Sequence, residues 1–135
     1  MVNEIEGSLA TGLPGRDAAG RTTPDLLLAI AEALFVLGVK ERVVLHGPEL
    51  SVARDAAGQT AVVPSLKLPA GWIKGTVGAG DAFCAGMLYS FVKGMTSEEG
   101  MRLASCAAAA NLAAPDSVSG ALNLADTLAL ERFRA

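Results

Sequence analysis

The segment after residue 23 places apolar and polar residues at the spacing of an α-helix. Thr23 suits the N-cap, Pro24 the first helical position and Asp25 the positive end of the helix dipole. The apolar stripe consists of Leu26, Leu27, Ile30, Leu34 and Leu37. Gly38 ends the pattern, so the sequence predicts a helix over residues 24–37.

A short run of apolar and β-branched residues follows, from Arg42 to Gly47. It shows little alternation, which is typical of a buried strand in a parallel sheet. Residues 50–54 and 59–63 flank the turn at 55–58 and predict a β-hairpin.

Three more helices are predicted in the second half of the chain. Residues 79–93 are helical in pattern, and Gly94 closes them. Thr96 and Glu99 have the spacing of a capping box and open a helix over 97–113, which ends before Pro115. A last helix covers 122–133. This order of elements predicts an α/β fold with helices packed on a small sheet.

Composition sharpens this prediction. The chain has 135 residues, of which 51% are hydrophobic and only 4% aromatic, and this length corresponds to one domain or a piece of one. Abundant alanine and glycine with few aromatic residues favour closely approaching helices and strands over a bulky-core sandwich.

Charge and sequence pattern exclude several classes of function. The 11 basic and 14 acidic residues are scattered, so we expect no nucleic-acid and no membrane binding. No apolar run approaches the roughly 18–20 residues of a membrane span, and the acidic start is unlike an export signal. We therefore expect a cytoplasmic protein. Cys84 and Cys106 lack CxxC spacing and are interpreted as buried free thiols, with a disulfide as the alternative; with one His they cannot complete a zinc site.

The glycine-rich turn at residues 75–81 carries the most chemical information. Gly78 and Gly80 lie at the start of a predicted helix, whose first N–H groups lack internal partners and lie at the positive end of its dipole. Such a turn is an anion site suited to a phosphate. It is not a Rossmann fingerprint, because Phe83 stands where the third Gly would be, and no Gly-Lys-Ser/Thr follows as in a Walker A loop.

Asp81 makes this turn more specific, because a carboxylate beside a phosphate site repels the ligand if binding is the only task. A carboxylate is useful at this position if it accepts a proton while a phosphoryl group is held nearby, as in a kinase that acts on an alcohol. The alternative is that Asp81 is simply the N-cap of the helix.

Two segments resemble the PfkB, or ribokinase-like, family of carbohydrate kinases. Residues 76–83, followed by Ala85 and Gly86, are similar to the second signature of that family. Asn3 and Glu6 resemble its Asn-x-x-Glu element, with Thr11 and Gly12 at the usual place. The resemblance implies a ribokinase-like α/β fold, in which a partial Rossmann-like layered sheet is flanked by helices.

The resemblance also implies roles for individual residues. Asp81 matches the catalytic base, and Gly78, Ala79 and Gly80 match the anion hole for the transferred phosphate. A nucleotide site is implied by a second set, which consists of His46, Gly47, Cys106, Ala109 and Ala110. ATP and Mg²⁺ are the implied cofactors, and Asn3 with Glu6 would organise Mg²⁺, largely through water. From the residues alone, His46 can equally be a polar strand-end residue and Glu6 a first-turn acid of a short helix.

Departures from the family pattern limit these expectations. Gly75 stands where the family usually has an Asp that is tied to a monovalent-cation site in several members, so a monovalent-cation requirement is doubtful. Gly47-Pro48-Glu49-Leu50 lacks the second Gly of the usual strand-end motif. Family members are also much longer, and their Asn-x-x-Glu element lies past the middle of the chain.

The length therefore indicates that residues 1–135 are the C-terminal, nucleotide-side part of such a kinase domain, without the N-terminal sugar-binding and lid half. The implied substrates are ATP and a sugar or another small alcohol. Because a cut sheet exposes an edge and apolar faces, we expect a homo-oligomer or a requirement for the missing half. The alternative is a non-catalytic remnant that binds a nucleotide or a partner protein.

Overall fold

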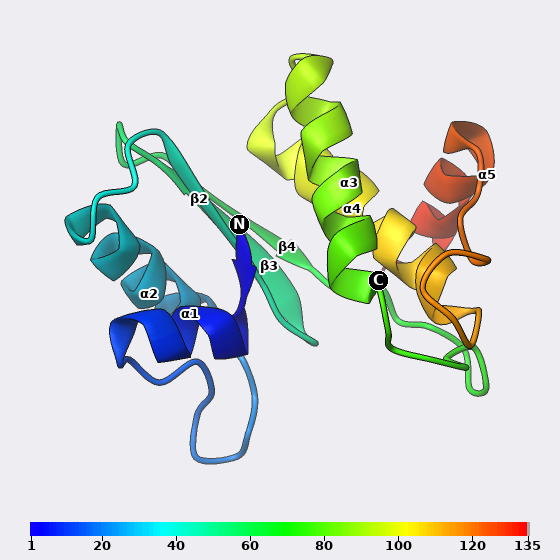
Figure 1. Ribbon diagram of the computed structural model, residues 1–135, viewed down its shortest axis with the longest axis horizontal. Helices are drawn as coiled ribbons and strands as arrows, with labels where there is room; N and C mark the ends of the chain where they lie inside the picture. Colours follow the sequence, from blue (N-terminus) through cyan, green and yellow to red (C-terminus); the bar gives the residue numbers. More distant parts are fainter. Residues whose placement is uncertain (135) are drawn as a thin grey trace. The chain divides into compact units, whose positions relative to one another are not determined.

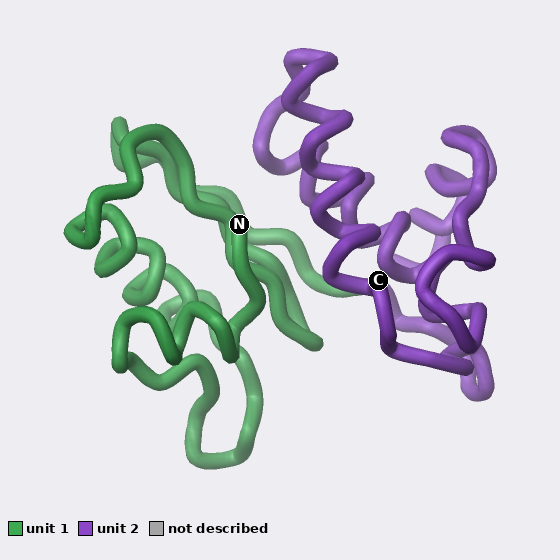
Figure 2. Tube along the Cα trace, viewed as in Figure 1, with its two compact units in different colours: residues 1–65 green, residues 66–135 purple. Residues whose placement is uncertain are grey.

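The computed structural model describes residues 1–134 and divides into two compact units, Met1–Ser65 and Leu66–Ala135 (Figure 2). The first unit contains the sheet and two helices, and the second is helical (Figure 1). Each unit is described by itself. In the part of the chain that the structure describes, no helix is both long and apolar enough to cross a membrane.

The sheet of the first unit has four strands in the order β1-β2-β3-β4. Their bounds are Val2–Asn3 for β1, Arg42–His46 for β2, Leu50–Asp55 for β3 and Thr60–Pro64 for β4. The predicted hairpin is confirmed, because β2, β3 and β4 pair antiparallel in succession. The expectation that β2 belongs to a parallel sheet holds only for its pairing with the two residues of β1, so the sheet is mixed.

Two helices complete this unit, α1 (Glu4–Thr11) and α2 (Pro24–Val36). The predicted start of α2 is confirmed: Thr23 is the N-cap, and its hydroxyl accepts the N–H of Leu26 at 3.5 Å. The helix packs on β2 and β3, where Leu27 and Ile30 are fully buried against Leu45 and Val52. This cluster is the core of the first unit.

The second unit consists of α3 (Ala79–Val92), α4 (Ser97–Leu112), α5 (Leu124–Ala129) and a 3₁₀ turn (Leu130–Phe133). The predicted capping box of α4 is confirmed, because Thr96 and Glu99 bond reciprocally. Helices α3 and α4 approach closely: a Cβ on Gly86 would lie 2.6 Å from the Cα of Ala104. The predicted last helix starts two residues late, since Asn123 supplies the N-cap by accepting the N–H of Asp126.

A separate apolar cluster holds α4 against the C-terminal turn. Cys106 and Ala109 of α4 are buried there together with Leu130, and Trp72 and Phe133 pack against them. The rings of Trp72 and Phe133 meet edge to face at 5.2 Å. The Trp72 indole N–H donates to the Ala109 carbonyl at 2.8 Å, so the only tryptophan of the chain is fixed in this core.

Candidate functional site

The start of α3 is shaped by Gly78, which is its N-cap. Gly78 has φ 82° and ψ −4°, a left-handed conformation that favours glycine. A Cβ at this position would lie 2.7 Å from the Cβ of Ser117 and 2.8 Å from its Cα. Both the left-handed backbone conformation of Gly78 and the close approach of Ser117 therefore require glycine here.

The first N–H groups of α3 are left open by this geometry. The N–H of Ala79 reaches the Thr76 carbonyl only at 3.4 Å, and the first regular bond of the helix runs from Ala82 N–H to the Gly78 carbonyl at 2.9 Å. Among residues 1–134, no acceptor is bonded to the N–H groups of Gly80 and Asp81. Two free amides at the positive end of a helix dipole can bind an anion.

Asp81 is the third residue of α3, and its side chain is exposed. Within the described chain, no donor is hydrogen-bonded to its carboxylate, and the N-cap makes no side-chain bond. Since Gly78 occupies the N-cap position, the alternative that Asp81 caps the helix is wrong. The carboxylate is therefore free to accept a proton next to the open amides.

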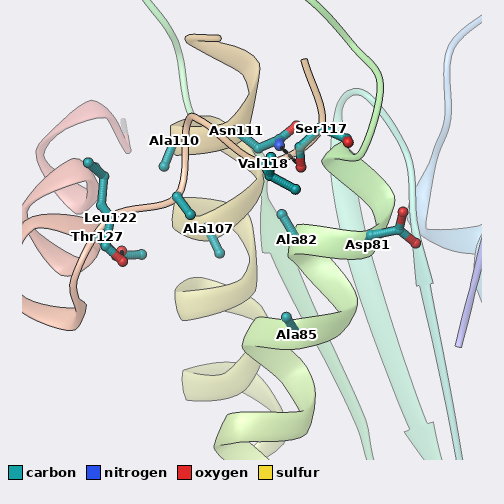
Figure 3. Close-up of a pocket in the computed structure, with 11 residues that line it drawn as sticks. Asp81, Ala82, Ala85, Ala107, Ala110, Asn111, Ser117, Val118, Leu122 and Thr127 are labelled. Carbon is teal, nitrogen blue, oxygen red and sulfur yellow. Dashed lines mark hydrogen bonds between the residues drawn. The ribbon is translucent and has the colours of Figure 1, made fainter. Parts of the chain in front are cut away.

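A cavity of about 350 Å³ opens beside this helix start (Figure 3). Most of its wall is apolar and comes from α3, α4 and the segment that leads into α5: Ala82, Ala85, Ala107, Ala110, Val118, Ala121 and Leu122. Its polar members are Asp81, Asn111, Ser117 and Thr127. A concave, mainly apolar cavity of this volume is typical of a small-molecule site.

Asp116 holds one wall of this cavity in shape. Its Oδ1 accepts the N–H groups of Val118 at 2.9 Å and Ser119 at 2.7 Å, and its Oδ2 accepts the Ser119 hydroxyl. These bonds lower the pKa of Asp116 to about 2, the Ser119 hydroxyl contributing most. From the α4 side, Asn111 Nδ2 donates to the Ser117 carbonyl at 2.8 Å, as the dashed line in Figure 3 shows.

The predicted nucleotide-site residues of α4, Cys106, Ala109 and Ala110, all belong to the buried cluster against which Trp72 packs. Of the three, Ala110 also lines the cavity, whereas Cys106 and Ala109 are not among its lining residues. Burial raises the pKa of the Cys106 thiol to about 12, and its bond to Glu131 at 3.4 Å acts in the same direction. Ala107 and Asn111 were not predicted, although Ala110 and Asn111 follow Ala107 by three and four residues, the spacing of one helix face.

In the first unit, the sheet register brings the other predicted residues together. Asn3 of β1 pairs with His46 of β2, and Gly47 follows directly. Burial lowers the pKa of His46, because it disfavours the charged imidazolium, while the carboxylates of Glu4 and Glu6 act against this shift. Gly47 lies close to another segment: a Cβ on it would meet the Cγ2 of Thr22 at 2.7 Å.

Asn3 and Glu6 form a capping box at the start of α1. Asn3 Oδ1 accepts the N–H groups of Ile5 and Glu6, and Glu6 Oε2 accepts the Asn3 N–H at 2.9 Å. The Glu6 side chain is exposed, and its Oε1 has no hydrogen-bond partner within residues 1–134. A single exposed carboxylate oxygen fits a Mg²⁺ ion that keeps most of its water. The described residues contain no cluster of three or more His, Cys, Asp or Glu side chains that could hold a metal directly.

Comparisons with known proteins agree with this architecture. The family model described as pfkB family carbohydrate kinase matches residues 1–122. A ribokinase of Arabidopsis thaliana is 35% identical over 106 residues, which are 78% of this chain and 26% of that protein. The structure of Arabidopsis thaliana ribokinase complexed with ribose and ATP has a TM-score of 0.79 and 26% identity, over 97% of this chain and 39% of that chain.

The structure of phosphofructokinase-2 from Escherichia coli in complex with substrates and products has a TM-score of 0.72 and 22% identity, over 98% of this chain and 39% of that chain. These similarities confirm the expected ribokinase-like fold. The chain spans 26% of the curated relative and 39% of the solved ribokinase.

Proposed function

Because the chain belongs to the pfkB family of carbohydrate kinases, we propose that it carries the nucleotide-binding and proton-accepting part of a kinase that transfers a phosphoryl group from ATP to a hydroxyl of a sugar or sugar-like substrate. The observation that carries this proposal is the free Asp81 carboxylate beside the open amides of α3. The ribose and ATP bound to the similar Arabidopsis thaliana ribokinase support the choice of substrates.

In this proposal Asp81 is the catalytic base. It accepts the proton of the acceptor hydroxyl as the hydroxyl oxygen attacks the γ-phosphorus, and the bond from that phosphorus to the leaving ADP oxygen breaks. The turn of Gly78, Ala79 and Gly80 is the anion hole. Its open N–H groups and the helix dipole stabilise the charge that develops on the transferred group.

The cavity beside α3 would hold the base of the nucleotide, with Ala110 as one of the predicted residues in its wall. We assign His46 and Gly47 to the neighbourhood of the nucleotide phosphates, as the resemblance to the family implies. Asn3 and Glu6 would hold Mg²⁺ largely through water; when bound, the ion neutralises charge on the phosphates.

The chain spans only part of its relatives, so we propose that it is their C-terminal, nucleotide-side part. The residues that select the acceptor would then lie in the remainder of such a kinase. The same observation favours a second candidate, a module that binds a nucleotide or a partner protein without turnover.

The role of Asp81 is tested with Asp81→Asn, which removes the proton acceptor and leaves every amide in place. With the sugar-binding half supplied as a second chain, phosphoryl transfer should fall by a factor of about 10²–10⁴. The affinity of the 135-residue chain for ATP, measured by calorimetry, should change little. The matched control is Asp126→Asn, since Asp126 occupies the same first-turn position in α5.

Equal losses of ATP binding and transfer in Asp81→Asn would indicate a structural role and contradict the assignment. ATP binding without transfer by the complemented wild-type protein would favour the non-catalytic module instead.

A further inference from the structure

The side walls of the cavity present methyl groups to whatever it binds. Figure 3 shows Ala82 and Ala85 of α3 opposite Ala107 and Ala110 of α4, with Leu122 closing one side. Such walls hold a flat ring by contact area and dispersion, which depend on the shape of the ring and not on its hydrogen-bonding edge.

The two buried polar side chains of the wall, Thr127 and Asn111, make hydrogen bonds within the protein. The Thr127 hydroxyl donates to the Asn123 carbonyl at 2.8 Å and lies 3.4 Å from that of Leu122. Asn111 Nδ2 donates to the Ser117 carbonyl, while Asn111 Oδ1 has no partner in the described chain and is buried from solvent, so it is not presented at the cavity surface.

Three backbone donors of the adjoining loop are also engaged, and the loop residues that line the cavity are exposed. The N–H groups of Val118 and Ser119 point to Asp116 within their own turn, and the N–H of Ala121 donates to the Val118 carbonyl at 3.1 Å. Ser117 and Asp81 are exposed, so a hydrogen bond from either side chain to a ligand would replace one to water and add little binding free energy.

We infer that this cavity accepts purine bases without reading their hydrogen-bonding edges, so that ATP, GTP and ITP are nearly equivalent phosphoryl donors for this chain. The inference rests on the proposed function, which places the base here. Strong discrimination between bases requires a buried polar group that the wrong base leaves unpaired. The walls offer no such group at their surface. Pyrimidines bury less ring area and bind more weakly.

The test is calorimetric titration of the 135-residue chain with ATP, GTP, ITP and CTP in one Mg²⁺ buffer, which keeps the triphosphate contribution constant. The three purine nucleotides should have dissociation constants within about fivefold of one another, with CTP weaker. A preference for ATP over GTP of more than about twentyfold overturns the inference but leaves the proposed function standing. Absence of binding by every nucleotide overturns both.

Matched substitutions on α4 locate the base. Ala107→Leu fills the cavity and should weaken all purine nucleotides by a similar factor, about tenfold. Inorganic tripolyphosphate, which has no base, should bind the variant as it binds the wild type. Ala108→Leu is the control, because Ala108 is equally half-buried and does not line the cavity. Unchanged purine affinities in Ala107→Leu would overturn the inference.

Thr127→Val completes the test, since it removes the one hydroxyl of the wall that is buried. The ratio of GTP to ATP affinity should not change, because that hydroxyl donates within the protein. A change of more than about tenfold in this ratio would show that Thr127 reads the base and would overturn the inference. Thermal unfolding followed by Trp72 fluorescence verifies that each variant is folded.

Discussion

The two glycines at the ends of α3 distinguish the energetic cost of a left-handed backbone conformation from that of a steric clash with a neighbouring segment. Gly78 and Gly94 both have positive φ, 82° and 69°, but only Gly78 is also approached by another segment. A Cβ on Gly94 would meet nothing within 4 Å.

Gly94→Ala should therefore lower the free energy of unfolding by about 1 kcal/mol, the cost of the left-handed conformation alone. Gly78→Ala should cost more than about 3 kcal/mol, because the added methyl collides with the Ser117 backbone. Urea denaturation followed by Trp72 fluorescence measures both. Equal losses of unfolding free energy in the two variants would contradict the packing of Ser117 on the start of α3.

Cys106 gives the second unit a dependence on alkaline pH. Its pKa is about 12 in the folded protein against an ordinary 9.0, so between these values the folded chain retains a proton that the unfolded chain releases. Its contribution to stability is complete below pH 9 and is lost as the pH rises towards 12, at up to about 1.4 kcal/mol per pH unit.

Cys106→Ala should therefore reduce the fall in stability between about pH 9 and pH 11. Urea unfolding of both proteins at several pH values checks this. The same slope in both proteins would contradict the prediction.

At the residue scale, the glycine turn could be recognised from sequence because its chemistry is local. Gly78 and Asp81 lie in one short segment, and their relation depends only on where α3 begins. Which alanines of α4 face the cavity and which are covered by the core could not be predicted from the sequence, since all of them are the same residue type. Only packing against Trp72 decides that Ala109 is covered by the core while Ala107 faces the cavity.

Among the elements, α1 joins a structural and a proposed functional role in the same side chains. The Asn3–Glu6 capping box stabilises its first turn and uses one oxygen of the Glu6 carboxylate. The proposed magnesium role uses the charge and the other oxygen. A substitution that keeps the cap and removes the charge separates the two.

Glu6→Gln is that substitution, because Gln also serves in a capping box. The free energy of unfolding should change by less than about 0.5 kcal/mol. Half-maximal ATP binding should then require more Mg²⁺, which a titration of ATP affinity against Mg²⁺ concentration would show. An unchanged titration would remove Glu6 from the proposed magnesium site.

Element boundaries were predicted well wherever a cap marks them. Thr23 and Thr96 start their helices as expected, and both hairpin strands begin and end within one residue of their predicted bounds. β1 was not predicted, since two residues are too few to show a period and only the pairing with β2 defines the strand. The late start of α5 depends on Asn123, whose capping geometry is not evident from hydrophobic spacing.

For the whole molecule, the chain exposes large apolar side chains in both units. Leu9 of α1 is 81% exposed and Val92 of α3 is 86% exposed, and Leu88, one turn before Val92, is 56% exposed. Such surfaces favour association. They agree with the expectation that the isolated chain self-associates or requires a complementary half, which stays a prediction.

Sedimentation velocity should accordingly show a weight-average mass that rises with protein concentration. Val92→Lys should reduce this rise with little loss of stability, because the side chain is already in water. A monomer at every concentration, with a sharp melting transition that does not depend on concentration, would contradict the prediction.

The alanine walls beside α3 and α4 also bear on how such a protein can change over generations. An alanine codon differs from a serine codon at a single base, and the two side chains differ by one hydroxyl. In the proposed nucleotide site, a single mutation at Ala107 or Ala110 would therefore place a hydroxyl in the wall that faces the base. A preference for one nucleobase could thus be acquired, exchanged or lost in small steps while the fold is retained.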